Sequence, residues 1–423
     1  MRSGPHVTRP TPHRLKEASR LTCDAPQRRT IDAVDLGPPA SPRAVIEPEP
    51  LRIVLGGDLM LGRGIDQCMA RHVDPRLFEP VVRDARHYVE LAERRHGPIA
   101  APLSASAPWG DALAWLEVDA SRLRVVNLET AITSSPGAWI GKAVHYRMHP
   151  ANVRCLQAAR IDACSLANNH VLDWGHAGLA DTLQALRRAG IRTAGAGLNA
   201  RQAERPARLP LAAGGALLLF AWAFPSSGVP LSWQAGSDQS GVALLERIDE
   251  ASLEHMRRCI AGQRRPGDRV VVSLHWGGNW VDEIPEPHRW LARRLIDQAG
   301  VDVVFGHSSH HPLPLELHHG RLILYGCGDL INDYEGLPAH GQRRSDLVCL
   351  YGLELNAGTG ALRALELRPF QLRGFQLRLP QPADREWLAS RMGLETPPRG
   401  WCWQSLSDHW RLEPANGGAA SEW

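Results

Sequence analysis

Five largely apolar runs set the pattern of this chain, and each ends abruptly in polar residues. They cover residues 51–55, 123–126, 161–166, 270–274 and 301–305. Short runs rich in Val, Ile and Leu are typical of strands that are buried on both faces of a parallel sheet. Residues 191–196 and 216–224 add two further expected strands. The hydrophobic pattern therefore predicts an α/β fold.

Helical periods lie between several of these runs. One predicted helix carries three leucines on one face and ends near Gly190, and another covers residues 290–298 before Gly300. Glycine at these positions is typical of a helix C-terminal cap. Residues 65–118 are expected to be mostly helical, with a polar interruption at 97–109. The leucines of the first helix are Leu179, Leu183 and Leu186.

The two ends of the chain differ from its centre. Residues 1–48 are rich in Arg, Pro, Thr and Ser and have no hydrophobic period, which indicates a disordered arm or a start codon placed too early. Alternating runs between residues 346 and 379 predict an antiparallel edge or a small second layer, followed by a tail of helix and coil. We therefore expect an arm (1–48), a core (49–336), and C-terminal strands and tail packing on that core (337–423).

Composition narrows the class of protein. The 423 residues are 43% hydrophobic and 22% charged with a net charge of +3, which is ordinary for a soluble protein and gives no sign of nucleic-acid binding. Eight cysteines without a C-x-x-C pair indicate reduced thiols rather than a disulfide framework. We see no apolar window of transmembrane length and no secretory signal, so we expect a cytoplasmic protein.

The polar residues at the strand ends carry the candidate chemistry. Because the carboxyl ends of strands in a twisted sheet converge, side chains far apart in sequence can share one pocket there. Two carboxylates, an amide and three imidazoles suit a divalent metal such as Mn²⁺, Fe or Zn²⁺ better than Mg²⁺. The bland alternatives are that the aspartate caps a helix and that the histidine loop is a solvated turn. The candidate ligands are Asp58, Glu129, Asn169, His275, His307 and His310.

Basic and aromatic residues follow some of the same strands. They are suited to holding an extended, anionic substrate. The candidates for this role are Arg63, Lys142, Arg147, Trp276 and Trp280, together with Asn168 beside the ligand Asn169.

Five segments at these strand ends resemble the motif series of the CapA family, the poly-γ-glutamate capsule biosynthesis proteins. The segments are residues 57–63, 127–130, 166–170, 275–277 and 306–310. The family resembles the calcineurin-like metallophosphoesterases, which implies a four-layer α/β/β/α sandwich with a C-terminal extension and a dinuclear metal site. By the same resemblance His170 would be a general acid or an oxyanion donor, with Arg63 beside it as a second catalytic candidate.

The resemblance also predicts how metal would be shared. One ion would be held by Glu129, Asn169, His275 and His307. A second would have Asp58, the shared Glu129 and His310, because Met60 stands where the phosphoesterases carry a further histidine. A thioether is a poor partner for Mn²⁺ or Zn²⁺ beside carboxylates. We therefore expect one tight metal per chain, and a second one recruited by added metal or substrate.

The function implied is capsule or poly-γ-glutamate biosynthesis or processing, most simply by a metal-dependent hydrolase or transferase acting on an anionic polymer. One alternative is a phosphodiesterase or phosphatase unrelated to capsule. Another is a non-catalytic assembly factor that binds the polymer or a poly-γ-glutamate synthetase subunit.

Overall fold

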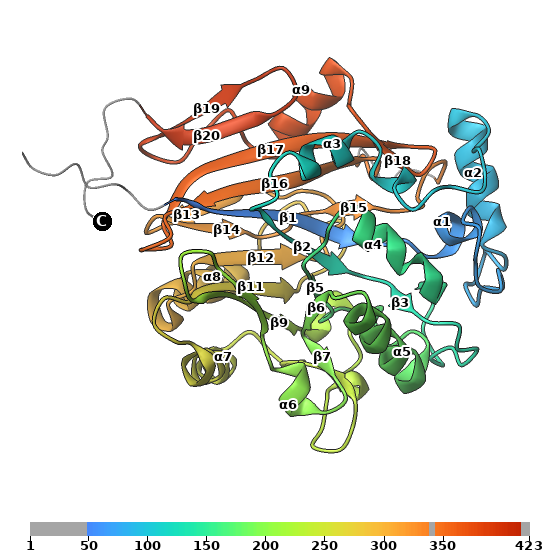
Figure 1. Ribbon diagram of the computed structural model, residues 1–423, viewed down its shortest axis with the longest axis horizontal. Coiled ribbons are helices and arrows are strands. Elements are labelled where there is room, and N and C mark those ends of the chain that lie inside the picture. Colours follow the sequence, from blue (N-terminus) through green and yellow to red (C-terminus); the bar gives the residue numbers. More distant parts are fainter. Residues whose placement is uncertain (1–48, 338–342, 416–423) are drawn as a thin grey trace, which may run out of the picture. The chain divides into compact units, whose positions relative to one another are not determined.

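Two β-sheets lie face to face in the computed structural model, which describes residues 49–337 and 343–415 (Figure 1). The arm predicted at 1–48 lies outside the described residues. In the larger sheet the strand order is β19 (Trp401–Ser405), β20 (Trp410–Pro414), β17 (Leu362–Arg373), β16 (Leu347–Leu355), β1 (Leu51–Leu59), β2 (Leu123–Leu128), β5 (Ala163–Ser165) and β6 (Arg192–Ala194). Two short strands, β15 (Asp329–Ile331) and β18 (Gln376–Arg378), pair with β1 and β17.

The smaller sheet has six strands. Their order is β13 (Leu315–His318), β14 (Arg321–Leu324), β12 (Val303–His307), β11 (Arg269–His275), β9 (Ala216–Ala223) and β8 (Ala207–Pro210). Its central strands β9, β11, β12 and β14 are parallel to one another, as are β1, β2, β5 and β6 of the larger sheet. Two-stranded pairs are formed by β3 (Ala131–Ile132) with β4 (Arg147–Met148), and by β7 (Ala196–Gly197) with β10 (Gly241–Val242).

Strand β9 explains why its sequence is apolar without alternation. Leu217 and Leu219 belong to the core between the two sheets, whereas Leu218 and Phe220 belong to a second core under helices. The helices over that second core are α7 (Glu250–Gln263) and α8 (Glu286–Ala299). Both faces of the strand are therefore buried, as expected for a central strand of a sandwich.

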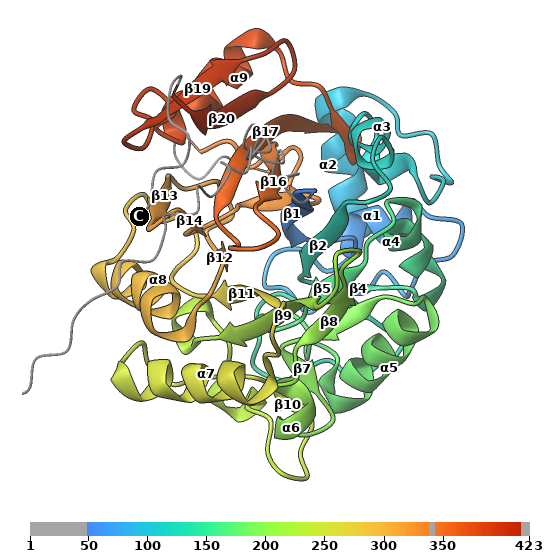
Figure 2. The same ribbon diagram turned by 60° about the vertical axis from the view of Figure 1, so that its left-hand side comes forward.

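Helices also cover the outer face of the larger sheet (Figure 2). Apolar residues of α3 (Ala112–Glu117), α4 (Arg154–Ala158) and α5 (Gly175–Arg188) join the core of that sheet. The helix–sheet–sheet–helix layering confirms the predicted α/β/β/α sandwich. No helix in the described part of the chain has the length and hydrophobicity needed to cross a membrane.

Two local predictions were wrong. Residues 65–118 form only α1 (Arg63–Gln67), α2 (Arg86–His96) and α3, because Pro75 and Pro80 interrupt the stretch between the first two helices. The strands at 346–379 are antiparallel as expected, but they form neither an edge nor a second layer, because β16 lies between β1 and β17 inside the larger sheet. The tail does contain the expected helix, α9 (Pro382–Arg391), and β19 and β20 then extend that sheet.

Candidate metal centre

The carboxyl ends of five strands meet at one place between the two sheets. Asp58 near the end of β1 and His307 at the end of β12 lie on different sheets, yet Nδ1 of His307 is 3.2 Å from Oδ1 of Asp58. Within the smaller sheet His275 and His307 are register partners on adjacent strands. The strand ends thus bring the predicted ligands together as their placement in the sequence suggested.

Asp58 is fully buried and held on several sides. Its oxygens accept hydrogen bonds from Nδ2 of Asn127 at 2.8 Å and from the backbone N–H of Ser308 at 3.1 Å. Burial alone would raise the pKa of Asp58, but the hydrogen bond to His307 and the charges of the surrounding histidines hold that pKa well below its usual range. Asp58 is therefore a carboxylate near neutral pH.

Glu129 has the opposite surroundings. It is fully buried, and neither of its carboxylate oxygens has a hydrogen-bond partner among the residues that the structure describes. Its Oε1 lies 3.8 Å from Nε2 of His275 and 3.8 Å from Nε2 of His170, which is too long for hydrogen bonds. Burial and the charge of Asp58 raise the pKa of Glu129 well above its usual value. A buried carboxyl with no protein partner fits the role of a cation ligand.

His170 is oriented by residues on its far side. Its Nδ1 lies 2.6 Å from Oδ2 of Asp173, and the ammonium of Lys142 contacts Asp173 and the carbonyl of Asn169. Burial lowers the pKa of His170 to about 4, against the opposing charge of Asp173. The contact with Asp173 fixes the orientation of the His170 ring, so that its Nε2 is directed toward Glu129.

His310 is held in a similar way. Its Nδ1 lies 2.7 Å from Oδ1 of Asp329, whose other oxygen accepts a hydrogen bond from Asn332 at 2.8 Å. Burial acts to lower the pKa of His310, but the Asp329, Glu129 and Asp58 carboxylates raise it to about 10. His310 therefore lies in a strongly negative environment, which also favours a cation at this position.

Backbone strain marks the loop that carries His310. Ser308 and His310 have φ angles of +80° and +56°, which non-glycine residues seldom adopt. The Ser308 hydroxyl donates to the carbonyl of Gly277 at 3.0 Å, and that of Ser309 donates to the carbonyl of His311 at 2.7 Å. Strain held by such bonds is characteristic of functional sites.

The remaining predicted ligands form two groups, one around Glu129 and one around Asp58. Oδ1 of Asn169 lies 3.1 Å from Nε2 of His275, beside Glu129. His307 instead has Nδ1 toward Asp58 and Nε2 3.0 Å from the Ser273 hydroxyl, inside the sandwich. The structure thus groups His275 and Asn169 with Glu129, and His307 with Asp58.

Asp58, Glu129 and His310 form a fully buried group that could hold a metal ion. One potential ligand atom from each lies within 4.8 Å of the other two. Carboxylate oxygens, imidazole nitrogens and the Asn169 amide make a mixed donor set without sulfur, and such a set fits a divalent transition metal. The Glu129 carboxylate has no hydrogen-bond partner among the described residues, which favours a metal ion at this position.

Several predicted substrate-binding residues are fully engaged in packing. Asn168 donates to the carbonyl of Leu128 and to Asn127, and its own oxygen accepts from two backbone N–H groups. Trp276 is buried, stacks on His288 at 4.3 Å and donates to the Tyr325 carbonyl. These contacts use the polar atoms that a substrate would need.

The two predicted arginines are engaged as well. Arg147 lies over the ring of Trp174 at 3.6 Å and donates to two backbone carbonyls. Arg63 is buried and pairs with Asp333 and Glu79. The sulfur of Met60 accepts a hydrogen bond from Tyr334 at 3.5 Å.

Two predicted residues do border the metal ligands. The ring of Trp280 lies 5.3 Å from that of His310, and Lys142 contacts the Asp173–His170 pair. Sequence reasoning missed Asn127, Asp173 and Asp329, which orient the ligands. The spacing of Asp173, three residues after His170, was the one local signal for them.

Comparison with known proteins gives the family. Residues 52–334 match the family described as bacterial capsule synthesis protein PGA_cap. The chain belongs to this family. A Mycobacterium tuberculosis member named "Probable polyglutamine synthesis accessory protein" is 43% identical over 342 residues, which is 81% of this chain and 90% of that protein. The PGA biosynthesis protein CapA of Bacillus subtilis is 26% identical over 52% of this chain and 54% of its own.

Solved structures resemble this PGA_cap chain only distantly. A phosphatase from Mycoplasma pneumoniae aligns with a TM-score of 0.39 and 12% identity over 80% of this chain and 97% of its own. The calcineurin-like phosphoesterase YfkN from Bacillus subtilis gives a TM-score of 0.39 and 12% identity over 82% and 97%.

Proposed function

We propose that this protein is a metal-dependent accessory enzyme of poly-γ-glutamate synthesis or processing, acting on the anionic polymer as a hydrolase or transferase. The observation that carries the proposal is Glu129, a buried carboxyl with two unpartnered oxygens facing imidazoles. The polymer is suggested by the name of the Bacillus subtilis relative, a PGA biosynthesis protein, while the Mycobacterium tuberculosis relative is named for polyglutamine synthesis. The donor set supports the metal.

Glu129, His275 and Asn169 would hold one ion, with Asp58 and His310 offering a second position that shares Glu129. When bound, such an ion supplies Lewis acidity that polarises a substrate carbonyl or phosphoryl oxygen and acidifies water. Because the Met60 sulfur is engaged by Tyr334, we retain the expectation of about one tight equivalent per chain.

His170 is the residue that would move a proton. Since Nδ1 is hydrogen-bonded to the Asp173 carboxylate, the neutral ring carries its proton there and leaves Nε2 as an acceptor. The hydrogen bonds place Nε2 on the Glu129 side. This geometry favours His170 as a proton acceptor over the general acid or oxyanion donor expected from the resemblance.

Lys142 would help to attract the polymer. Its ammonium contacts Asp173 and lies 4.9 Å above the ring of Trp233. As the one lysine side chain beside the described ligands, it brings positive charge close to His170. An anionic substrate would be drawn to the same side as the proton acceptor.

Metal analysis of the purified protein tests the proposal first. We expect about one equivalent of transition metal in the wild type and a large loss in Glu129→Gln. Asp302→Asn is the matched control. Asp302 is as buried as Glu129, but it accepts a hydrogen bond from the Val270 N–H at the ends of β11 and β12 that lie away from His275 and His307. Equal metal content in wild type and Glu129→Gln would show that the ligands are assigned wrongly.

Turnover is the second test. Poly-γ-glutamate incubated with the metal-loaded protein should be shortened or transferred, and both a chelator and Glu129→Gln should abolish the change. Hydrolysis of phosphodiesters without any effect on the polymer would replace the proposal with an unrelated phosphodiesterase. Polymer binding that is insensitive to chelation and brings no turnover would replace it with a non-catalytic assembly factor.

A further inference from the structure

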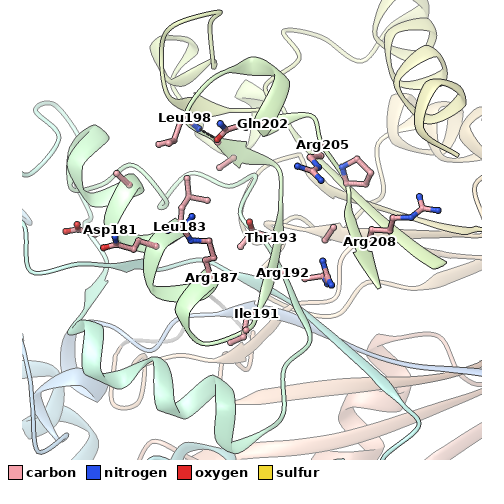
Figure 3. A pocket seen from close by; sticks show the side chains of 17 residues that line it. Asp181, Leu183, Arg187, Ile191, Arg192, Thr193, Leu198, Gln202, Arg205 and Arg208 are labelled. Atoms are coloured by element: carbon pink, nitrogen blue, oxygen red, sulfur yellow. Dashed lines mark hydrogen bonds between the residues drawn. The ribbon is translucent and has the colours of Figure 1, made fainter. Parts of the chain in front are cut away.

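A groove lies away from the metal centre (Figure 3). It has a volume of about 900 Å³ and lies where the outermost strands β6 and β8 of the two sheets approach each other. Helix α5 borders one side, and α6 (Ala200–Ala203) borders the other. None of the candidate metal ligands lines it.

Arginines dominate the charge of this groove. Figure 3 shows Arg187 on α5, Arg192 at the start of β6 and Arg205 just after α6 around the hollow. All three are exposed, and none pairs with a carboxylate among the residues that the structure describes. A fourth, Arg208, is neutralised by the buried Asp268 at 2.6 Å. The lining contains one acidic residue, Asp181, which accepts a hydrogen bond from Thr133.

The three arginines are distinguished by sharing one concave surface without a carboxylate partner, whereas many others on the surface are paired. Arg257 and Arg293, for example, are half-exposed or exposed and are paired with Glu254 and Glu316. Three guanidinium groups sharing a concave surface repel one another unless anions approach. Because the guanidinium matches carboxylate and phosphate oxygens in a two-point geometry, the groove is suited to several anionic groups at once.

The other lining residues indicate which anion. No aromatic side chain lines the groove, so the bases of a nucleic acid would have nothing to stack on. Leu183 and Leu198 offer aliphatic surface between the arginines, and the amides of Gln184 and Gln202 offer hydrogen bonds. A polymer with carboxylates, methylene groups and amide links matches all three kinds of contact.

We infer that this groove is a second binding surface for an acidic polypeptide whose carboxylates pair with Arg187, Arg192 and Arg205. The proposed function enters only in naming poly-γ-glutamate as that polymer. Helix α5 begins two residues after Asp173 of the metal centre and carries Arg187 in its last turn. Its 14 residues span about 20 Å, so one polymer chain is long enough to contact both places.

Fluorescence anisotropy with end-labelled poly-γ-glutamate tests the inference on the full chain in the presence of EDTA. The triple variant Arg187→Gln, Arg192→Gln, Arg205→Gln should bind about tenfold more weakly, from three exposed charge pairs. The loss should shrink as salt rises from 50 to 300 mM.

The matched control removes the same charge elsewhere. Arg154, Arg160 and Arg188 are exposed and have no carboxylate partner among the described residues, and they do not line the groove. Their triple change to Gln should leave the affinity within twofold of the wild type. Equal loss in both triple variants would reduce the effect to net charge, and no loss in the groove variant would overturn the inference.

Two further conditions distinguish the groove from the metal centre and from a site for other polyanions. Because EDTA keeps metal out of every sample, the affinity measured there does not depend on the metal proposal, so failure of the metal proposal and failure of the groove would be distinguishable. Single-stranded DNA and polyphosphate of equal charge serve as competitors. If either displaces the polymer at lower concentration than unlabelled poly-γ-glutamate does, the assignment to an acidic polypeptide is wrong.

Discussion

Replacing Glu129 by glutamine should change stability in opposite directions with and without metal. In the metal-free protein both carboxylate oxygens are buried without partners. A buried polar group without a hydrogen bond costs about 1–3 kcal/mol, and more when it is charged. Because the pKa of Glu129 is raised well above its usual value, folding near neutral pH either buries an unpartnered charge or takes up a proton, and the neutral amide of glutamine avoids that cost while keeping the shape. We therefore expect metal-free Glu129→Gln to be more stable than the metal-free wild type by about 1–2 kcal/mol.

Metal reverses the order. A ligand present at 100 times its Kd adds about 2.7 kcal/mol to the free energy of unfolding of a protein that binds it. The wild type should gain this amount, whereas Glu129→Gln, having lost the ligand that both positions share, should gain little. For a chain of this size about 1 °C of Tm corresponds to 1 kcal/mol. The variant should melt about 1–2 °C above the wild type in EDTA and below it in excess Mn²⁺ or Zn²⁺.

Differential scanning calorimetry at pH 7.5 gives the Tm of both proteins with EDTA and with added metal. Asp302→Asn again serves as the control, because that carboxyl accepts a hydrogen bond from Val270 and faces Arg321 at 3.3 Å. It should be destabilising in both conditions by a similar amount. If Glu129→Gln also lowers Tm equally with and without metal, the unpartnered carboxyl is not a cation site and the reasoning fails.

Three further predictions concern the framework around the site. Burial against Trp276 lowers the pKa of His288 to about 4. The neutral ring therefore contributes fully to the free energy of unfolding above pH 6.5, and this contribution is lost as pH falls toward 4. In urea titrations the wild type should lose about 2 kcal/mol of stability from this group between pH 7 and pH 5, and His288→Phe should not show that loss. Gly306→Ala would place a Cβ 2.2 Å from the Tyr325 carbonyl oxygen and should cost at least about 2 kcal/mol, whereas Gly262→Ala in open space on α7 should stabilise by about 0.5–1 kcal/mol; equal effects would contradict the packing at Gly306. Arg63→Met leaves two buried carboxylates unpaired and should cost about 3–5 kcal/mol, while the folded fraction keeps its metal; loss of metal at unchanged stability would give Arg63 a role in the centre.

The strand ends were predictable because a strong local signal coincided with a general rule of topology. The run before His307 and the run before His275 are apolar enough to be strands whatever their neighbours. Parallel strands then bring their carboxyl ends together without further information. The sandwich followed from the family resemblance, and the strand order bears it out.

The residues that orient the ligands were not predictable in the same way. Asp329 belongs to a short strand beside β1, and only the folded chain brings it 2.7 Å from His310. Trp276 and Arg147 follow strand ends as a substrate-binding residue would, yet their long side chains reach inward to pack on His288 and Trp174. Sequence gives the position of a residue on a strand, whereas the side-chain direction depends on neighbours from distant elements. The central place of β16 was missed for the same reason, since pairing partners leave no local pattern.

The pairing of β1 with β16 has a consequence for synthesis of the chain. Leu51 near the amino end of the described chain is the register partner of Leu355. A ribosome adds about 5–20 residues per second, so the backbone of β1 waits on the order of tens of seconds before its antiparallel neighbour emerges. During that interval one side of the strand that carries Asp58 is an unpaired edge, open to pairing with other nascent chains. Premature termination before β16 would leave that edge permanently exposed, so truncated products should aggregate rather than accumulate as partly active protein.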